Sequence, residues 1–463
     1  MEKLTLRELL EAVNGRLMGE FSDLEATVEK VETDSRTIGE GSLFIPLVGE
    51  RFDGHAYIES ALEAGAAGCL TQRERESYLP GKFYIKVENT HRALRDLAVW
   101  YRRKFHVPVV AVTGSVGKTT TKDMIAAVLS ERFDVLKTDG NKNNDIGLPL
   151  TLLRLESHHQ IAVVELGINH PGEMDYLSGI AQPDVVCITN IGDSHIEAFG
   201  CRENTLAAKA EIFNHAKAGA LAVLNGDDPL LLTLKGKTPG KAVFCGRGEG
   251  LDFWVGELES DWRSQISCDV VTPTGSCRMD IPALGEHMIY PTLMATAVGE
   301  YFGMTAEEVA EGVRKFAPTK MRMNILARRD GITILDDAYN ANPQSMRAAI
   351  EVLDGYTGEY KIAVLGDMFE LGPLASVLHA GVGEALGHSH VDCLVAVGEL
   401  AKNIYDAALT SQVPECYHFD TKERAMLTIH DLLRPGTTIL VKASRGMEFE
   451  TITDYLKSIT AEA

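Results

Sequence analysis

A glycine-rich segment followed by lysine and threonine is the part of this sequence whose chemistry is clearest. Residues 113–120 read Thr-Gly-Ser-Val-Gly-Lys-Thr-Thr. Glycine-rich turns let backbone N–H groups approach a phosphate closely. A lysine at this place can reach the β and γ phosphates, and the threonine after it can hold Mg²⁺ through its hydroxyl. The segment predicts a nucleotide-phosphate site built from Gly114, Ser115, Val116, Gly117, Lys118, Thr119 and Thr120.

The spacing of this segment departs from the standard phosphate loop, in which four residues separate the two glycines. Val112 stands where the first glycine would be, so only the shorter pattern Gly-x-x-Gly-Lys-Thr remains. A chance glycine turn before a helix is the alternative interpretation. An apolar strand is predicted directly before the segment, at 109–112, and a helix after it, from Thr121. Because a phosphate loop requires this context, the context favours the phosphate loop.

An acid and a histidine follow two further predicted strands. Glu165 comes directly after the apolar run 161–164, and His195 follows the run 185–188 after a short turn. Ligands of open α/β sheets bind at the carboxyl ends of the strands, so both side chains are expected beside the phosphate loop. There they are candidate Mg²⁺ ligands, although Mg²⁺ prefers oxygen. A cap or ion pair for Glu165 and a surface loop for His195 are the alternatives.

Two other polar features invite a functional interpretation. Lys209 is predicted to lie on a helix, where a solvated lysine paired with Glu203 or Glu211 is the simpler reading. Residues 141–149 form a loop rich in asparagine, which includes Asn144. Asparagine and glycine favour turns, so this is either a plain loop or a set of amide donors to phosphate or substrate.

The order of predicted elements indicates an α/β protein. Strand-like runs alternate with helical stretches after residue 107 and again after 318, which is typical of parallel sheets. Residues 241–282 are richer in glycine, serine and aspartate, and we expect a peripheral antiparallel segment there. The last part predicts four strands, at 332–335, 362–365, 393–397 and 438–441. We expect three domains, at 1–88, 89–317 and 318–463.

Composition excludes some classes of function. The chain of 463 residues has 45 lysines and arginines against 66 acidic residues, a net charge of −21, which argues against a general nucleic-acid binder. No apolar run approaches the roughly 20 residues of a membrane helix, so no membrane insertion is expected. The eight cysteines are scattered, and the N-terminus lacks the apolar core of a signal peptide, which favours a cytoplasmic protein.

Several further short segments have sequences that, together with the features above, match a known family pattern. They are residues 34–36, 225–229 and 322–324, and two longer C-terminal segments at 336–343 and 365–372. Together with the features above, they resemble the Mur ligase family of ATP-dependent amide-forming ligases over nearly the whole chain. The two C-terminal segments resemble those of members that add a D-Ala-D-Ala dipeptide rather than a single amino acid.

The resemblance implies an architecture and a reaction. It implies a small α/β N-terminal domain that holds a UDP-linked substrate, a central P-loop ATPase domain with a parallel sheet, and a C-terminal Rossmann-like domain. The implied substrates are ATP, UDP-N-acetylmuramoyl-tripeptide and D-alanyl-D-alanine, with Mg²⁺ as cofactor and an acyl phosphate as intermediate. A monomeric chain is expected.

The resemblance also implies roles for individual residues. Ser35 and Arg36 would contact the uridine diphosphate, and Arg322 and Asp337 would contact the nucleotide from the C-terminal domain. A carbamylated Lys209 would supply an anionic oxygen to a metal ion. The implied metal ligands are Thr119, Glu165, His195 and Lys209; the implied catalytic residues are Lys118, Lys209 and His195; the amide loop makes Asn144 a substrate-binding candidate.

Two segments depart from the family pattern. A stretch that carries two asparagines near the adenine in the family reads His-Met-Ile-Tyr-Pro-Thr here, at 287–292, which leaves the adenine contacts open. The C-terminal Lys-Gly-Ser-Arg-Gly-Met pattern has Ala443 in place of its first glycine. An alanine restricts the backbone wherever a positive φ is needed.

Several rival interpretations remain at this stage. The nearest are another Mur-type ligase that adds one amino acid and a ligase of folate polyglutamates. A non-catalytic nucleotide-binding relative is disfavoured because Lys118, Thr119, Glu165, His195 and Lys209 are all present. A P-loop switch or motor ATPase lacks a clear partner surface in the sequence.

Overall fold

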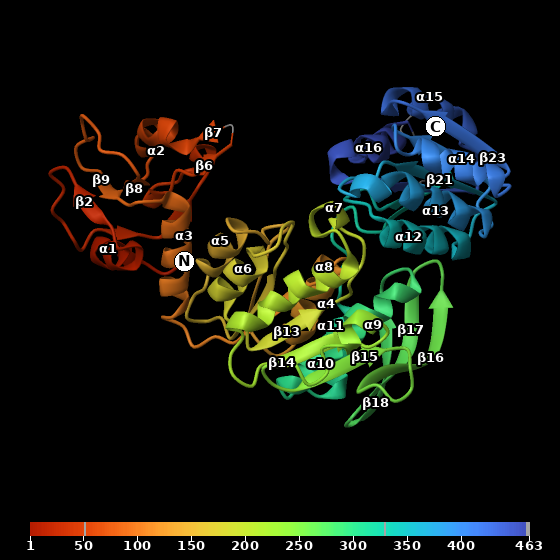
Figure 1. The fold of residues 1–463 in the computed structure, drawn as a ribbon, viewed down its shortest axis with the longest axis horizontal. Helices are drawn as coiled ribbons and strands as arrows, with labels where there is room; N and C mark the ends of the chain where they lie inside the picture. The colour runs from red at the N-terminus through yellow and green to blue at the C-terminus, as the bar shows by residue number, and fades with distance from the viewer. Residues whose placement is uncertain (51, 328–329, 460–463) are drawn as a thin grey trace.

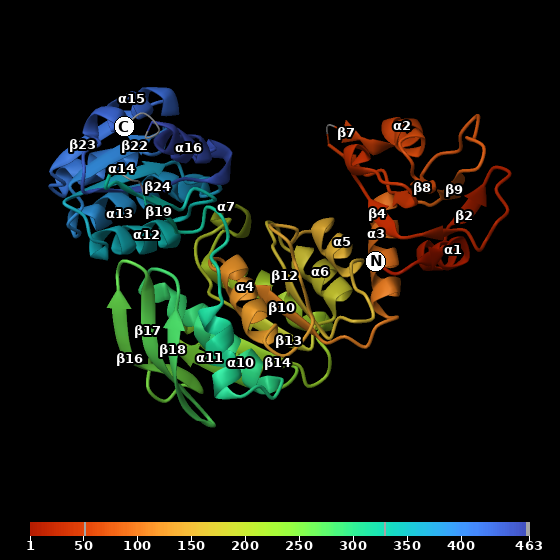
Figure 2. The ribbon, with the colours of Figure 1, turned by 180° about the vertical axis from the view of Figure 1, so that it is seen from behind.

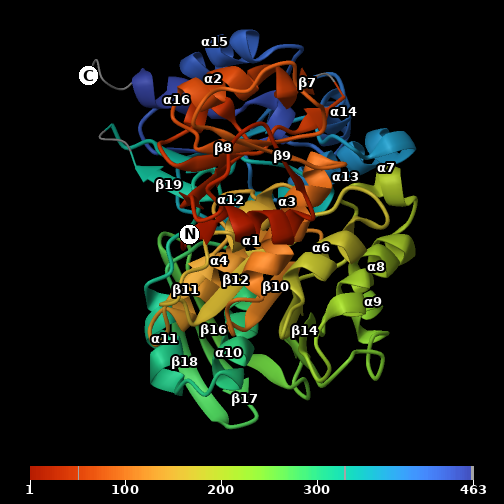
Figure 3. The same ribbon diagram turned by 90° about the vertical axis from the view of Figure 1, so that its left-hand side faces the viewer.

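The computed structural model describes residues 1–50, 52–327 and 330–459. Within these ranges the strands form three large sheets, of five, nine and six strands, and two small strand pairs. Figures 1 and 2 show the large sheets in chain order, with the nine-stranded sheet between the other two. In the side view of Figure 3, the N-terminal and C-terminal sheets both stand above the nine-stranded one. The predicted α/β fold class is confirmed.

The N-terminal sheet is small and mostly parallel. Its order is β2-β9-β8-β5-β4, and the β2–β9 pair alone is antiparallel. Helix α1 (Leu6–Val13) begins at a capping box in which the side chains of Thr5 and Glu8 bond each other's backbone N–H. The strands of the sheet are β2 (Arg16–Met18), β4 (Lys30–Glu32), β5 (Ser42–Phe44), β8 (Gly68–Thr71) and β9 (Phe83–Lys86). The other elements are β1 (Leu4–Thr5), β3 (Thr27–Val28), η1 (Ser35–Thr37), β6 (Val48–Gly49), β7 (Phe52–Asp53), η2 (Gly54–Tyr57) and α2 (Ile58–Glu63).

Helix α3 (Thr90–Arg102) leads from this sheet into the central one. Its buried face includes Leu94, Leu97 and Tyr101. These side chains belong to one continuous cluster that also contains Leu9 of α1 and Val109 of the central sheet. The N-terminal and central parts therefore share a hydrophobic core.

The central sheet has the order β11-β12-β10-β13-β14-β15-β16-β17-β18. Every pair from β11 to β16 is parallel, and the last two pairs are antiparallel. The inner strands are apolar and buried, as expected of a parallel sheet covered by helices on both faces. The strands are β10 (Val109–Thr113), β11 (Val135–Lys137), β12 (Ile161–Glu165), β13 (Val185–Ile188), β14 (Leu221–Asn225), β15 (Ala242–Gly246), β16 (Phe253–Asp261), β17 (Gln265–Thr272) and β18 (Gly275–Ile281). The helices are α4 (Lys118–Leu129), α5 (Gly147–Leu152), α6 (Glu173–Ala181), α7 (Ile196–Phe199), α8 (Arg202–Ala210), η3 (Glu211–His215), α9 (Pro229–Leu232), η4 (Glu286–Met288), α10 (Ile289–Tyr301) and α11 (Ala306–Arg314).

The C-terminal sheet has the order β19-β20-β24-β21-β22-β23, and only the β19–β20 pair is antiparallel. Its core consists of two clusters, in which Ile196 and Leu284 are the members that come from before residue 318. The strands are β19 (Asn324–Ala327), β20 (Thr333–Asp336), β21 (Tyr360–Gly366), β22 (Cys393–Val397), β23 (Glu415–Phe419) and β24 (Thr437–Lys442). The helices are α12 (Pro343–Gly355), η5 (Gly372–Leu374), α13 (Ala375–Gly387), α14 (Lys402–Thr410), α15 (Lys422–Leu432), η6 (Arg445–Met447) and α16 (Glu450–Ser458).

The structure corrects three expectations about elements. The C-terminal sheet has six strands and not the four predicted, because β19 and β23 are edge strands that are only partly buried and lack a continuous apolar run. The segment 241–282 is not wholly antiparallel, because β15 and the start of β16 continue the parallel sheet. The apolar, largely buried residues of β15 suit that inner position. The helix after the phosphate loop begins at Lys118, three residues earlier than expected. No helix within the described ranges is both long enough and apolar enough to cross a membrane.

Candidate active site at the carboxyl edge of the central sheet

The predicted phosphate loop joins the end of β10 to the start of α4, and two glycines shape it. Gly114 has φ of +142°, and a Cβ there would lie 1.9 Å from the Thr189 hydroxyl, so only glycine fits. Gly117 has φ of +81° and precedes the first residue of α4. The N-terminal N–H groups of a helix carry a partial positive charge, which favours an anion such as phosphate.

The turn after β13 holds the loop in shape. The N–H of Val116 donates to the side-chain oxygen of Asn190 at 2.9 Å, and the Thr189 hydroxyl donates to the carbonyl of Val116 at 2.6 Å. The Ser115 hydroxyl accepts from the N–H of Gly192 at 2.8 Å. The loop conformation is therefore set by the protein itself.

Lys118 curls back over this loop. Its Nζ donates to the carbonyls of Gly114 and Ser115, at 2.8 and 3.2 Å. Burial lowers the pKa of Lys118; the Glu165 carboxylate opposes that shift, and nearby Arg322 adds to it. Lys118 is thus near an acid of the same edge and a guanidinium that comes from the start of the C-terminal part.

Glu165 lies where the sequence placed it. It ends β12 and pairs in register with Val112 of β10, directly beside the phosphate loop. Its side chain is buried; Oε1 accepts from the Asn143 amide at 2.8 Å, whereas Oε2 has no hydrogen-bond partner among the described residues. Thr119 is also buried at this edge. A buried carboxylate oxygen without a partner is an open acceptor.

His195 follows β13 and reaches the C-terminal part. It adopts a left-handed backbone conformation, with φ of 58°, and its Nδ1 forms an ion-pair contact with the Glu370 carboxylate. Glu370 is also left-handed, with φ of 63°, and the hydrogen bond to His195 lowers the pKa of this carboxyl group. Such conformations are rare for residues other than glycine and cluster at functional sites.

Lys209 is on α8 and only 1% exposed. Within the described ranges its amine forms no hydrogen bond or ion pair, so the solvated pair with Glu203 or Glu211 does not form. Burial, together with the charge of Lys118, lowers the pKa of Lys209 well below its usual value. Burial therefore favours the neutral form of this amine.

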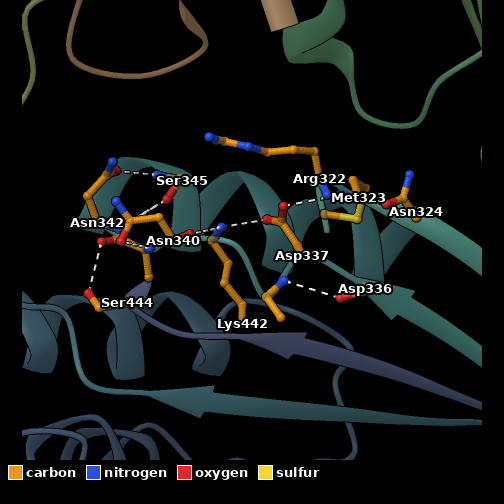
Figure 4. A network of polar contacts seen from close by, with 12 residues as sticks. Arg322, Met323, Asn324, Asp336, Asp337, Asn340, Asn342, Ser345, Lys442 and Ser444 are labelled. Atoms are coloured by element: carbon orange, nitrogen blue, oxygen red, sulfur yellow. Dashed lines mark hydrogen bonds and ion pairs between the residues drawn. The ribbon is translucent and has the colours of Figure 1, made fainter. Parts of the chain in front are cut away.

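The nucleotide residues predicted from the C-terminal part lie in one polar network, shown in Figure 4. Lys442 donates to the Asp337 carboxylate and to the carbonyl of Asn340, and Asp337 also accepts from the N–H of Met323. The Arg322 guanidinium stacks over the Tyr339 ring at 4.1 Å.

The backbone around Arg322 is strained. Met321 and Met323, which flank it, have φ of 59° and 50°. The Arg322 Nε has no hydrogen-bond partner in the part of the chain that the structure describes, and the side chain extends from the network in Figure 4. An arginine that is held by stacking, with a free donor, is suited to contact a further anion.

Direct contacts join the central and C-terminal parts beside the phosphate loop. The Asn342 amide donates to the Ser194 hydroxyl at 3.1 Å, and the N–H of Glu197 donates to the carbonyl of Glu370 at 3.3 Å. The Thr319 hydroxyl donates to the Asp123 carboxylate at 2.7 Å. The structure therefore brings Lys118, Thr119, Glu165, His195, Lys209 and Arg322 to one edge of the central sheet.

The predicted substrate-binding residues Ser35, Arg36 and Asn144 are not part of the set gathered around Lys118. Ser35 and Arg36 lie in η1 of the N-terminal part, away from the phosphate loop (Figure 1). The exposed Arg36 guanidinium pairs with Asp34 at 2.6 Å, and this lowers the pKa of Asp34 to about 2. The Asn144 side chain accepts from the N–H of Gly147, the first residue of α5, at 2.9 Å. This bond holds the turn that leads into the helix.

Sequence reasoning assigned no role to several residues of this edge. They are Asn143, Tyr339, Asn342, Glu370 and Lys442. All five lie inside segments that the sequence marks as functional, at 141–149, 336–343, 365–372 and 442–447. The segments were therefore predictable, but the roles of these individual residues were not. In the stretch that departs from the family pattern, the Tyr290 hydroxyl donates to Asp227 at 2.9 Å.

Comparison with known proteins places this geometry in a family. The family model described as "Mur ligase middle domain" matches residues 112–299, "Mur ligase, glutamate ligase domain" matches 321–445, and "Mur ligase family, catalytic domain" matches 27–102. The UDP-N-acetylmuramoyl-tripeptide–D-alanyl-D-alanine ligase of Bacillus subtilis is 38% identical over 98% of both chains.

Solved structures agree with this result. A MurF crystal structure from Acinetobacter baumannii superposes with a TM-score of 0.91, at 32% identity over 99% of both chains. A MurF ligase from Thermotoga maritima, in complex with ADP, superposes with a TM-score of 0.82 at 28% identity, over 94% of this chain and 98% of that one. The sequence models, the full-length identity and the shared three-domain architecture lead to one conclusion: the chain belongs to the Mur ligase family.

Proposed function

We propose that this chain is an ATP-dependent ligase that joins D-alanyl-D-alanine to UDP-N-acetylmuramoyl-tripeptide in peptidoglycan precursor synthesis. The observation that carries the proposal is the position of Lys118 in the phosphate loop beside Glu165 at one edge of the central sheet, where the C-terminal part is also in contact. Relatives and solved structures that match the whole chain are ligases of this name.

The chemistry requires concentrated positive charge. A free carboxylate does not form an amide with an amine at neutral pH, so the γ-phosphoryl group of ATP is first transferred to the tripeptide carboxylate. The bond between the β,γ-bridging oxygen and γ-phosphorus breaks, a carboxylate oxygen bonds to phosphorus, and ADP leaves. Lys118 and the N–H groups at the start of α4 stabilise the charge that develops as these two anions meet.

The second step forms the amide. The amine of D-alanyl-D-alanine attacks the acyl phosphate, the carbon–oxygen bond to phosphate breaks, and inorganic phosphate leaves as the amine loses a proton. Water must be excluded while the acyl phosphate exists. The contacts of Asn342 with Ser194 and of Glu370 with His195 hold the C-terminal part against this edge, which supports such exclusion.

The residues at this edge fit Mg²⁺. Within the described ranges the buried Glu165 Oε2 has no partner, and Thr119 lies in the first turn of α4 at the same edge of the sheet. His195 directs Nδ1 to Glu370, which leaves Nε2 for a ligand. No group of three His, Cys, Asp or Glu side chains with metal-site geometry occurs in the described ranges, so a further ligand must be of another kind. When bound, Mg²⁺ would neutralise the phosphate oxygens and orient the carboxylate.

Lys209 fits the role of that further ligand. A neutral amine reacts with CO₂, and the buried Lys209 amine, which has no hydrogen-bond partner within the described ranges, has a lowered pKa that favours this form. The nitrogen–carbon bond that forms gives a carbamate, the amine loses a proton, and the product has an anionic oxygen. We propose that carbamylated Lys209 joins Thr119, Glu165 and His195 as a metal ligand.

Substrate contacts follow from the same proposal. Arg36 and Ser35 contact the uridine diphosphate, with Arg36 exchanging part of its contact with Asp34 for phosphate oxygens. Arg322 and Asp337 contact the nucleotide, and Asn144 lies in the loop that lines the substrate.

We further propose domain boundaries of 1–88, 89–317 and 318–463, with a monomeric chain acting in the cytoplasm. The eight free cysteines suit that reducing compartment.

One assay tests the proposed reaction. Purified protein is incubated with ATP, Mg²⁺, UDP-N-acetylmuramoyl-tripeptide and D-alanyl-D-alanine, and the products are followed by mass spectrometry. The expected products are the UDP-linked pentapeptide, ADP and phosphate. Parallel reactions with single amino acids in place of the dipeptide test the rival ligases. Absence of pentapeptide under conditions in which both substrates bind would contradict the proposal.

A further inference from the structure

Two adjoining cavities lie along helix α3, away from the phosphate loop. The first, of about 420 Å³, is bounded by α3, by Ala12 of α1 and by Gly179 of α6. The second, of about 340 Å³, is bounded by the end of α3 and the segment leading into β10. Arg103 lines both, so the two cavities are neighbours, and together they are called the α3 hollow.

This hollow is at the opposite end of the central sheet from the proposed active site. Asp184, which lines the second cavity, precedes the first residue of β13, and its carboxylate accepts from the N–H of Val109, the first residue of β10. The phosphate loop follows the last residue of β10. The hollow therefore lies at the amino ends of strands whose carboxyl ends carry the catalytic machinery.

Three arginines of α3 and its end face this hollow without a carboxylate partner. Arg95, Arg102 and Arg103 line it, and none forms an ion pair in the described part of the chain. Arg102 is only 6% exposed; its Nη2 donates to the carbonyl of Gln182 at 3.1 Å, but its Nε has no partner. The Arg95 guanidinium stacks on Tyr176, and its Nε is also unpartnered. Buried polar groups without partners are rare and need an explanation.

The acidic residues of the hollow are already paired. Asp184 binds Lys217 at 2.8 Å, and Asp96 binds Arg92 at 3.6 Å. The His215 ring, in the first cavity, faces Asp175 at 3.3 Å. In a chain with 66 acidic and 45 basic residues, three unpaired guanidinium groups at one hollow are a local excess of positive charge. This charge is available to a ligand.

Gly179 lets the Arg95 guanidinium and the His215 ring lie close to helix α6. A Cβ built on it would lie 3.5 Å from Arg95 Nη2 and 3.6 Å from the His215 ring. The guanidinium and the imidazole therefore converge on the surface of α6 at the point where a side chain is missing. Arginine presents its N–H groups in a planar fork that matches the oxygens of phosphate.

We propose that this hollow binds a small polyvalent oxyanion bearing phosphate groups, held by Arg95, Arg102 and Arg103. The ligand bridges α1 of the N-terminal part and α6 of the central part, since Ala12 and Gly179 line the same cavity. Its phosphate groups come either from an inorganic polyphosphate or from a phosphorylated metabolite. The site is separate from the phosphate loop, and it does not depend on the identity of the reaction catalysed there.

Trp100 provides a direct readout, because it lines the first cavity and is one of three tryptophans in the chain. The titration uses the full-length protein and, in parallel, its Lys118→Ala variant, in which the phosphate loop has lost its lysine. Inorganic pyrophosphate is then added while tryptophan fluorescence and the heat of binding are recorded. A parallel titration with fructose 1,6-bisphosphate distinguishes a phosphorylated metabolite from an inorganic anion. The Trp100→Phe variant is expected to lose the fluorescence change and keep the heat.

Two variants test the site by independent means. Arg103→Gln removes one exposed charge, and Gly179→Leu fills the cavity without changing any charge. Each is expected to weaken binding about tenfold or more, which is the effect of losing a charge-assisted contact. Arg263→Gln removes an exposed arginine that lies outside both cavities, and it is expected to change the affinity less than about twofold.

Three results would overturn the proposal. The first is that neither anion binds the full-length protein, or that Lys118→Ala abolishes their binding, which would locate all anion binding at the phosphate loop. The second is that Arg103→Gln and Gly179→Leu both bind as tightly as the unmodified chain. The third is that Arg263→Gln weakens binding as much as Arg103→Gln, which would show a nonspecific effect of net charge.

Discussion

The imidazole of His195 and the carboxylate of Glu370 meet across the junction of the central and C-terminal parts, through Nδ1 of the ring. Both residues adopt left-handed backbone conformations, so the chain is bent on both sides of the contact. A carboxylate on one ring nitrogen fixes the tautomer and leaves the other nitrogen for a metal or substrate. Glu370 is therefore a positioning residue for His195 and also a contact between two parts of the molecule.

Replacing Glu370 with glutamine tests this positioning. The amide keeps the size of the side chain but loses the charge that orients the imidazole, so we expect kcat to fall by about tenfold or more. The KM for ATP should stay within about twofold, because the phosphate loop is untouched. Steady-state kinetics measure both, and Glu399→Gln, at an exposed acid before α14, is the matched control. A lower kcat in the control as well, or none in Glu370→Gln, contradicts the role.

Lys118 is expected to act on the transferred phosphoryl group and not on the UDP-linked substrate. In Lys118→Ala, turnover should fall by about 10³-fold or more, because a charge aimed at the transition state is removed. Calorimetry should show that UDP-N-acetylmuramoyl-tripeptide still binds, while Lys235→Ala, an exposed lysine, leaves both properties unchanged. Loss of turnover and UDP-substrate binding together would mean that the proposed domain roles are wrong.

Carbamylation of Lys209 predicts a dependence on CO₂. Removing CO₂ and bicarbonate from the buffers should lower activity, and adding bicarbonate should restore it, because the lowered pKa of the buried amine favours the reactive neutral form and the reaction is reversible. Lys209→Ala should be inactive, insensitive to bicarbonate and partly rescued by acetate, which supplies a carboxylate oxygen. Activity that is independent of bicarbonate, together with an intact mass showing no added CO₂, would refute the modification.

Tyr101 predicts a loss of stability at high pH. Its hydroxyl donates to the carbonyl of Leu155 at 2.6 Å and accepts from the N–H of Glu2 at 2.8 Å, and burial raises its pKa to about 12. From about pH 10 the unfolded chain loses the phenolic proton and the folded chain keeps it. The free energy of unfolding should therefore fall between about pH 10 and 12.

The Tyr101→Phe variant isolates this contribution. It should be less stable at neutral pH by about 1–2 kcal/mol, because two buried hydrogen-bonding groups lose their partner. Its unfolding free energy should also decline less steeply between about pH 10 and 12. Denaturant titrations at a series of pH values measure both effects, with Tyr57→Phe, 44% exposed, as control. Identical slopes in Tyr101→Phe and the unmodified chain would contradict the assignment.

The central site was predictable where local sequence determines geometry. Apolar strands and the glycines after them placed the phosphate loop, and the carboxyl-edge rule placed Glu165 and His195 near it. Gly114 shows why the loop is readable: its φ of +142° and its contact with Thr189 admit no side chain. The resemblance to the Mur ligase family added Lys209, whose bland interpretation as a solvated lysine is contradicted by its burial.

What sequence could not supply depends on contacts between distant segments. Lys442 and Asp337 are 105 residues apart, and neither local sequence indicates that the two side chains form an ion pair. In the amide loop, Asn143 rather than Asn144 reaches Glu165, a choice made by the path of the loop over the sheet edge. β15 was assigned to an antiparallel segment because its short apolar run, flanked by glycines, does not reveal the direction of its neighbours.

The hydrophobic core that α3 shares between the N-terminal and central sheets has a consequence for how the molecule melts. Because Leu9, Leu97 and Val109 belong to one cluster, heating should disrupt these two parts in a single cooperative transition. The C-terminal sheet has clusters of its own, joined to the rest through Ile196 and Leu284. Calorimetry should therefore resolve two endotherms, although the molecule has three large sheets. A non-hydrolysable ATP analogue that contacts both the phosphate loop and Arg322 should reduce the difference between the two melting temperatures.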